Sequence, residues 1–234
     1  MFSTAGTVTA QGVSDETIAG LHVIGHARVF LECDGAATLT LRGEGGHALT
    51  VDPDAKLTLG GTAPLTLALP PHARGLVDGS LTMTGGAHRL LARDTSAVMF
   101  APGSACEIST TGTVGPFGDG TGMSGMRSVY FAAGSRFDHI AGGDPFGAPA
   151  PHSVVAFLPG SRYVVRCTSA TVSLGGRTYA DFEYDAPGVS TIVPIESQVT
   201  MDTLVVRSGY FYFSQADALV LRGDLAVLGG GQLG

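Results

Sequence analysis

Three segments in the second half of the chain decide the fold: residues 98–104 read VMFAPGS, residues 129–135 read VYFAAGS and residues 155–161 read VAFLPGS. Copies of the shared pattern, V-x-F-x-x-G-S, begin 31 and 26 residues apart. Self-similarity at such spacings is typical of repeat architectures. Apolar residues two positions apart indicate a short strand, which here ends at a glycine turn. We expect the three strands to stack and to align their phenylalanines in one internal ladder: Phe100, Phe131 and Phe157.

A second shared element, a P-F-G loop, lies between the copies. Gly115-Pro116-Phe117-Gly118 and Asp144-Pro145-Phe146-Gly147 fall in the long irregular stretches 110–128 and 141–153. The unequal spacing of the copies indicates that the strands are fixed while these loops vary. Both loops follow a repeat strand, so they should emerge from the same edge of the stack. They are either filler insertions or a binding surface, since proteins often place binding sites in loops.

Shorter alternating pieces closed by glycine recur along the chain, and helical periodicity is nearly absent. Examples are Leu39-Thr40-Leu41, Leu57-Thr58-Leu59, Leu81-Thr82-Met83 and Leu225-Ala226-Val227. The first and third residues of each piece would face a core, and the residue between them would face outward. Strands this short cannot each bury a face alone, whereas stacked coils bury one continuous core together.

These patterns predict an all-β protein that folds as a right-handed parallel β-helix, or β-solenoid, in a single domain over residues 1–234. Residues 1–97 would supply rungs of the L-T-L-G type, and residues 98–234 rungs of the V-x-F-x-x-G-S type. At about 24 residues per coil there would be roughly ten coils, with about 4.8 Å between stacked strands. A β-sandwich or jelly roll is the alternative. It is disfavoured because Asn-Gly and Asp-Gly hairpin turns are scarce.

Composition excludes several classes of protein. Hydrophobic residues make up 44% of the 234 residues and charged residues only 14%, which is the reverse of a disordered chain. A net charge of −7 with a single lysine, Lys56, argues against nucleic acid and anionic membranes as partners, because both require a basic face. No apolar run approaches the roughly 18 residues of a membrane-spanning helix, so no membrane span is expected.

The cysteines and the first residues give limited information on the compartment. Cys33, Cys106 and Cys167 are far apart and belong to no CxxC or Cys/His cluster, so we expect buried free thiols. A disulfide would require two of them to stack in neighbouring coils. The first residues have neither the basic end nor the apolar run of a signal peptide. The protein is therefore either intracellular or exported by a signal outside this sequence.

The V-x-F-x-x-G-S repeats, their P-F-G loops and the following segment GRTYADF (residues 176–182) resemble the β-solenoid regions of large secreted bacterial cell-surface proteins. In those regions a G-[RK]-T-Y-x-N-[FL] segment follows the repeats, and later rungs read L-x-L-x-G-x-L-x-V-x-G, as residues 219–229 do. The likeness covers residues 98–229, with Asp181 where the pattern has asparagine. The resemblance implies an exported, adhesin-like or stalk-like module, extracellular or on the cell surface, with no catalytic residues to carry over.

A row of acidic residues is the candidate metal site. Asp181, Glu183 and Asp185 alternate with Phe182 and Tyr184, which on a strand places three carboxylates on one face and two rings on the other. Calcium binds several carboxylate oxygens, so calcium is the one cofactor to consider. The same residues could form the acidic cluster of a polysaccharide lyase. The simplest interpretation is a solvated outer face over an aromatic core.

A second polar group surrounds the second P-F-G loop and is a candidate ligand-binding edge: Asp138, His139, Asp144 and His152. With Arg136 and Arg162, which follow the G-S of two repeats, these residues could serve acid–base chemistry on a uronic acid polymer. Adjacent Asp138 and His139, however, point to opposite sides of a strand and cannot pair directly. The simpler interpretation is a set of turn residues beside an outward arginine ladder. Carboxylates such as Asp138 or Asp144 would then lie between the arginines.

The remaining patterns favour a structural role. The sequence holds no nucleophile elbow, phosphate loop or zinc motif, so a non-enzymatic protein is expected. Residues 210–213, YFYF, would expose either their tyrosines or their phenylalanines, for packing or for stacking on sugars. Residues 1–12 and the glycine-rich C-terminal segment offer no helix or charged strand to cover the outermost coils.

We therefore expect a non-catalytic structural or adhesive solenoid. The alternative is a carbohydrate-binding or polysaccharide-cleaving β-helix. The expected partners are copies of the same chain or further coils of a longer one, stacked end to end as a filament or stalk, and a surface polysaccharide.

Overall fold

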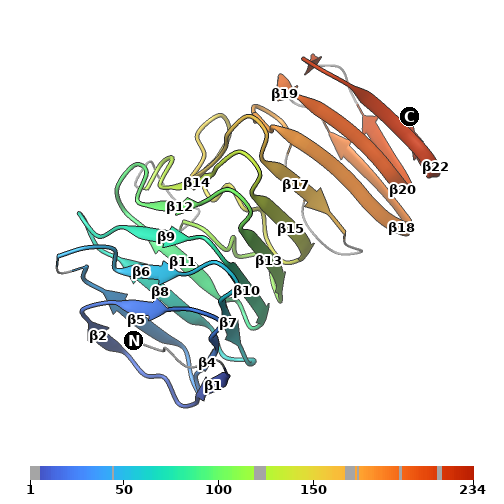
Figure 1. Cartoon of the computed structure of the whole chain (residues 1–234). Helices are drawn as coiled ribbons and strands as arrows, with labels where there is room; N and C mark the ends of the chain where they lie inside the picture. The colour runs from blue at the N-terminus through green and yellow to red at the C-terminus, as the bar shows by residue number, and fades with distance from the viewer. Residues whose placement is uncertain are drawn as a thin grey trace.

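The protein is a parallel β-solenoid of about 9 turns in the computed structural model, so the predicted fold class is confirmed with about one coil fewer than expected (Figure 1). Every strand pair in the described residues is parallel, which makes the β-sandwich alternative wrong. No helix long and apolar enough to cross a membrane occurs among these residues. The structure describes residues 6–43, 45–118, 125–166, 172, 174–194, 197–214 and 218–234, with the backbone alone for 192–194.

Ten strands stack into the largest sheet, here called the long face, which continues from one end of the solenoid to the other. In stacking order they are β1 (Thr7–Ala10), β4 (Arg28–Glu32), β7 (Lys56–Gly60), β10 (Ser80–Gly85), β13 (Ala105–Thr110), β15 (Arg136–Ala141), β17 (Arg162–Val165), β18 (Asp181–Pro194), β20 (Thr203–Ser214) and β22 (Leu225–Leu233). The marked N and C ends lie at opposite ends of this stack (Figure 1).

Two shorter sheets complete the coils. The first, here called the repeat face because it contains the V-x-F strands, comprises β3 (Leu21–Val23), β6 (Leu49–Val51), β9 (Gly75–Val77), β12 (Val98–Phe100), β14 (Val129–Phe131) and β16 (Val155–Phe157). The second, the short face, comprises β2 (Glu16–Ile18), β5 (Ala37–Leu41), β8 (Leu65–Leu69) and β11 (Arg89–Ala92). A separate pair, β19 (Val199–Met201) and β21 (Leu219–Leu221), belongs to the last coils.

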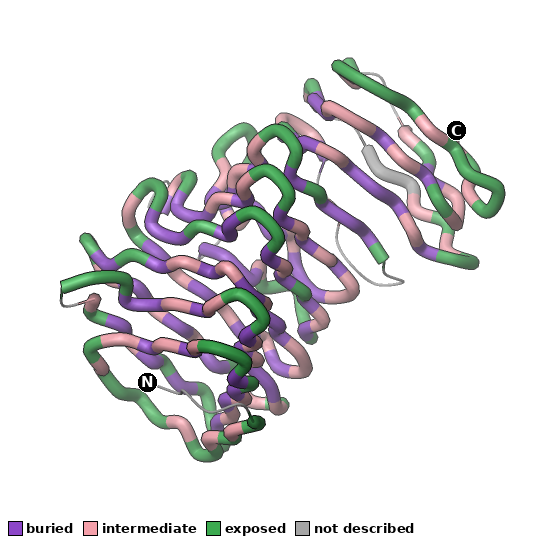
Figure 2. Tube along the Cα trace, in the orientation of Figure 1, coloured by how far each residue is buried: buried purple, intermediate pink, exposed green. Residues whose placement is uncertain are grey.

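The phenylalanines of the repeat stack as the sequence predicts. Parallel pairing places Phe100 beside Phe131 and Phe131 beside Phe157. Their ring centroids are 4.4 Å and 5.0 Å apart, with interplanar angles of 4° and 20°, and all three side chains are buried. Tyr179, from the GRTYADF segment, continues the ladder at 6.2 Å from Phe157. A continuous column of rings therefore lies in the core of these four coils. Figure 2 shows buried segments that recur from coil to coil along the stack.

The G-S end of each repeat is a tight turn that redirects the chain from the repeat face to the long face. In the second copy the N–H of Ser135 donates to the carbonyl of Ala132 at 3.0 Å, and the serine hydroxyl donates to the same oxygen at 2.6 Å. Between them Gly134 has a φ of +80°. A positive φ at this position defines a type II turn and favours glycine, which explains the invariant glycine of the pattern.

The P-F-G loops take the place of the short face after β11. Phe117 forms a parallel bridge with Leu90, and its ring packs 6.2 Å from that of Phe131. In the next coil Phe146 packs 6.0 Å from Phe157. Both loops therefore emerge on the same side of the stack, as expected, and each supplies a fully buried ring to the core. Residues 119–124 of the first loop lie outside the described part of the chain.

The described cysteines are free and buried, as the sequence predicts. Burial raises the pKa of both the Cys33 and the Cys106 thiol, so both remain protonated near neutral pH. Cys167 lies outside the described residues.

The ring ladder should contribute strongly to stability. Replacing Phe131 with Ala removes a ring stacked on both sides, and we expect a loss of about 3–5 kcal/mol in the free energy of unfolding. Met99 lies on β12 but is 41% exposed, so Met99→Ala should change stability by less than about 1 kcal/mol. Denaturant unfolding of both variants gives the comparison. Equal, small losses would contradict the ladder.

Candidate functional site

The predicted acidic row lies on β18 with the expected alternation. Phe182 and Tyr184 are fully buried, whereas Glu183 faces outward and is covered by its neighbours, leaving 7% of its side chain exposed. Arg207 Nε lies 2.5 Å from Glu183 Oε1, and Arg162 Nη1 lies 3.7 Å from Oε2. The hydrogen bond to Glu183 is the main cause of a raised pKa for Arg207. The carboxylate is therefore held between guanidinium groups from the coils on either side.

Asp138 lies in a similar arrangement two coils earlier. Arg136 Nη2 donates to Asp138 Oδ1 at 2.8 Å, and Arg166 Nε lies 3.2 Å from the same oxygen. Arg136 and Arg162 are register partners on adjacent strands, as the sequence predicts for an arginine ladder. Like charges in register repel, and the intervening carboxylates offset this. We call this alternating set the charge row: Arg136, Asp138, Arg162, Arg166, Glu183 and Arg207.

The three carboxylates of the expected calcium site do not converge. Asp185 follows a register shift in the pairing of β18 with β20, and its Oδ1 accepts a hydrogen bond from the Ser208 hydroxyl at 2.8 Å. Glu183 is already paired with arginines. Within the described parts of the chain, no three His, Cys, Asp or Glu side chains form a group that could hold a metal ion. Asp181, Glu183 and Asp185 thus lack the convergent oxygens that calcium requires.

The four residues of the expected ligand-binding edge lie in four different environments. His139 is fully buried, and its Nδ1 lies 2.8 Å from the hydroxyl of Tyr163. Its neighbour Asp138 belongs to the charge row outside, so the two point to opposite sides as predicted. Asp144 accepts a backbone N–H of its own P-F-G loop at 2.7 Å. Only His152 is exposed in a hollow of the surface.

Sequence reasoning missed the role of Arg177, which fastens the loop 141–153. Only 4% of this residue is exposed, and its guanidinium donates to the carbonyl oxygens of Ala148 and His152 and to the hydroxyl of Ser153. It also lies 4.7 Å from the centre of the Phe146 ring. Burial lowers the pKa of Arg177, and the charge of Asp144 partly offsets this. The sequence signal for this role was Arg177 itself. In the alternation of inward and outward side chains, its position is one where an apolar residue is expected.

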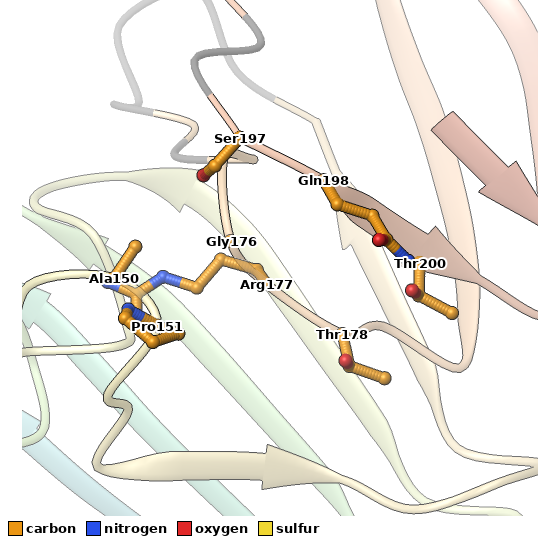
Figure 3. Close-up of a pocket in the computed structure, with 8 residues that line it drawn as sticks. All are labelled: Ala150, Pro151, Gly176, Arg177, Thr178, Ser197, Gln198 and Thr200. Atoms are coloured by element: carbon orange, nitrogen blue, oxygen red, sulfur yellow. The ribbon is translucent and has the colours of Figure 1, made fainter. Parts of the chain in front are cut away.

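A groove lies over the outside of the repeat face beside this arginine. It consists of two adjoining hollows of about 640 and 440 Å³, which share Pro151, Gly176 and Thr178. Figure 3 shows Ala150 and Pro151 on one side of the second hollow, with the Arg177 side chain reaching toward them. On the other side lie Ser197, Gln198 and Thr200. We call the two hollows together the outer groove.

The aromatic run at residues 210–213 exposes its tyrosines. Phe211 is fully buried, whereas Tyr212 is partly exposed and stacks on Tyr210 with ring centroids 6.1 Å apart. A Cβ added to Gly234, the residue after β22, would lie 2.8 Å from atoms of both tyrosines, so the end of the chain packs against the pair, which favours the packing interpretation.

Comparisons with protein-family models, with curated proteins and with solved structures gave no match to this chain. The functional argument therefore depends on the fold and on the geometry of the charge row, the outer groove and the coil ends.

The geometry around Glu183 predicts indifference to calcium. The melting temperature should stay the same with millimolar calcium and with EDTA, because a ligand stabilises a protein only by binding its folded state. Replacing Glu183 with Gln should lower stability by about 1–3 kcal/mol, since two guanidinium groups lose their carboxylate. A melting temperature that rises with calcium would restore the metal hypothesis.

Buried His139 should make stability depend on pH. Burial lowers its pKa from 6.5 to about 4, so the folded state holds the neutral ring. Protonation favours the unfolded state, so this stability is complete above about pH 6.5 and is lost as the pH falls toward 4. The loss should reach about 3 kcal/mol. Unfolding of wild type and His139→Gln across this range tests it, because the amide can still contact Tyr163 but does not titrate. Parallel pH profiles would contradict the assignment.

Proposed function

We propose that this chain is a non-catalytic structural and adhesive module that acts outside the cell and continues end to end, with copies of itself or with further coils of a longer chain. The single observation that carries the proposal is the state of the last strand. Leu225 and Val227 of β22 are register partners of Leu204 and Val206, which are buried in the core. Leu225 and Val227 themselves are 53% and 46% exposed. The core therefore presents an uncovered apolar layer to any coil that follows.

The first strand has a matching pattern. Val8 and Ala10 of β1 pair with buried Val29 and Leu31 of β4, and both are only partly buried. A second copy placed along the same axis would set Leu225 over Val8 and Val227 over Ala10. All strands would then remain parallel, and the free edges of β22 and β1 would exchange ladder hydrogen bonds. Such a head-to-tail contact is heterologous and does not close, so it builds a filament or stalk.

The engaged carboxylates favour a structural role over catalysis. Acid–base cleavage of a polysaccharide commonly uses two carboxylates on either side of the scissile bond. Asp138 and Glu183 are held by arginines of the charge row, and Asp144 accepts a backbone hydrogen bond. The exterior location rests on the resemblance to secreted bacterial surface solenoids.

End-to-end stacking should depend on protein concentration and on the inward-facing side chains of β22. Light scattering over a hundredfold dilution series should show wild-type protein shifting between single copies and longer assemblies. Val227→Lys places a charge in the exposed core layer and should abolish association. Ala226→Lys changes the outward side of the same strand and should leave association intact.

A single copy at every concentration, unaltered by Val227→Lys, would overturn the stacking proposal. Equal loss of association in Val227→Lys and Ala226→Lys would also overturn it, because a contact through the core layer distinguishes the two sides of the strand. Association that survives moderate salt supports the apolar contact, since salt screens charge pairs but not apolar burial.

A further inference from the structure

We propose that the outer groove binds an extended anionic polysaccharide of the polyuronate type. This inference rests on the adhesive part of the proposed function and names its ligand class. It does not depend on end-to-end stacking. Four features of the groove carry it: its charge, its neutral polar groups, its aromatic ring and its length.

The charge of the groove is opposite to that of the chain. The sequence has 20 Asp and Glu residues against 13 Lys and Arg residues, yet no acidic residue lines either hollow. The lining includes the exposed residues Arg127 and His152 and the buried Arg177. The carboxylate of Asp144 acts on the buried Arg177 and partly offsets the lowering of its pKa by burial, so Arg127 is the exposed arginine of the lining. The exposed lining thus contains an arginine and no carboxylate on an otherwise acidic protein, which favours an anionic ligand.

The fold fixes the backbone at Arg127 and the edge of the groove. Arg127 has a φ of +51°, its N–H donates to the carbonyl of Ser153 at 2.8 Å, and its carbonyl accepts the N–H of Ser96 at 2.8 Å. Arg177 donates to the carbonyl of His152 and to the hydroxyl of Ser153. Arg177 therefore positions the edge of the groove. The guanidinium of Arg177 is itself buried below the surface of the groove. A site that is organised before binding loses less entropy when a ligand arrives.

Neutral polar groups and one aromatic ring supply what a sugar requires. Tyr130 lies on the outward side of β14, where its register partners on the adjacent strands are the apolar residues Met99 and Ala156. The apolar face of a sugar ring can pack there. Hydroxyl and amide groups that can bond sugar hydroxyls line both hollows: Thr95, Ser153, Thr178, Ser197, Gln198 and Thr200.

The length of the groove favours a polymer over a single sugar. It extends from Thr95, before β12, past Tyr130 and Ala156 to Thr178 and Thr200. These positions belong to five successive coils, so the groove spans four steps of about 4.8 Å, or roughly 19 Å. A saccharide chain lying along the solenoid axis would contact several coils at once.

The same lining argues against cleavage and against nucleic acid. Neither hollow is lined by a carboxylate that could act as the acid or base of glycoside hydrolysis. A double-stranded phosphate backbone, which carries a charge about every 1.7 Å, would need more cations than the exposed lining supplies. The hydroxyls of a polyuronate, which a phosphate backbone lacks, fit the hydroxyl- and amide-lined hollows, and its carboxylates fit the exposed Arg127.

The test is isothermal titration of the full chain with polygalacturonate at low salt, with dextran as the neutral polymer and single-stranded DNA as the other polyanion. Wild-type protein should bind polygalacturonate and neither of the others. Arg127→Gln should weaken binding about tenfold, the effect of losing one charge-assisted hydrogen bond. Tyr130→Ala should weaken it by a similar factor. Arg42→Gln, which removes an exposed arginine away from the groove, is the matched control and should change affinity less than about twofold.

Melting temperatures within a few degrees of wild type show that each variant is folded. Titration of Val227→Lys separates the two proposals, because loss of stacking should leave polygalacturonate binding intact. No binding of polygalacturonate by folded wild-type protein would overturn the groove proposal. Equal weakening by Arg42→Gln and Arg127→Gln would do the same by showing nonspecific charge attraction. Equally tight binding of DNA or of dextran would also overturn it.

Discussion

In-register pairing of parallel strands is the constraint on which this structure depends. Each coil must place the same side of its strand inward at the same position as its neighbours, so one coil dictates the side chains of the next. The column Phe100, Phe131, Phe157 and Tyr179 is the clearest result, because each ring stacks on the ring of the adjacent coil. The same rule governs the outside, where the register brings Arg136 beside Arg162 and carboxylates lie between arginines.

The coils differ from one another where a segment departs from in-register strand pairing. The P-F-G loops replace strands of the short face but still insert Phe117 and Phe146 into the core. Arg177 occupies an inward position and turns its guanidinium to loop carbonyl oxygens. It thereby holds the edge of the outer groove. The site we propose for a polyuronate thus arises where two departures from the repeat, a long loop and a buried cation, meet on the repeat face.

Much of the fold was predictable because the side chains of a strand alternate between its two sides, so that core residues recur at every second position. The V-x-F copies predicted both the ladder and the parallel stacking. The coil number was less accurate, because strands of the long face begin between 19 and 31 residues apart. Of the candidate site residues, His152 lies in the outer groove and Asp138 lies between arginines as expected. The rest of the groove was not predictable, since its serines, threonines and glutamine form no motif and come together only through stacking.

The central claim is that the apolar layer left open at β22 is covered by another copy along the same axis. Small-angle X-ray scattering over a range of concentrations tests it most directly, because it separates the length of a rod from its cross-section. About 9 turns with a step of about 4.8 Å give roughly 43 Å per copy. The account predicts that length grows in multiples of this value at constant cross-section. A constant length, or growth in cross-section, would contradict it.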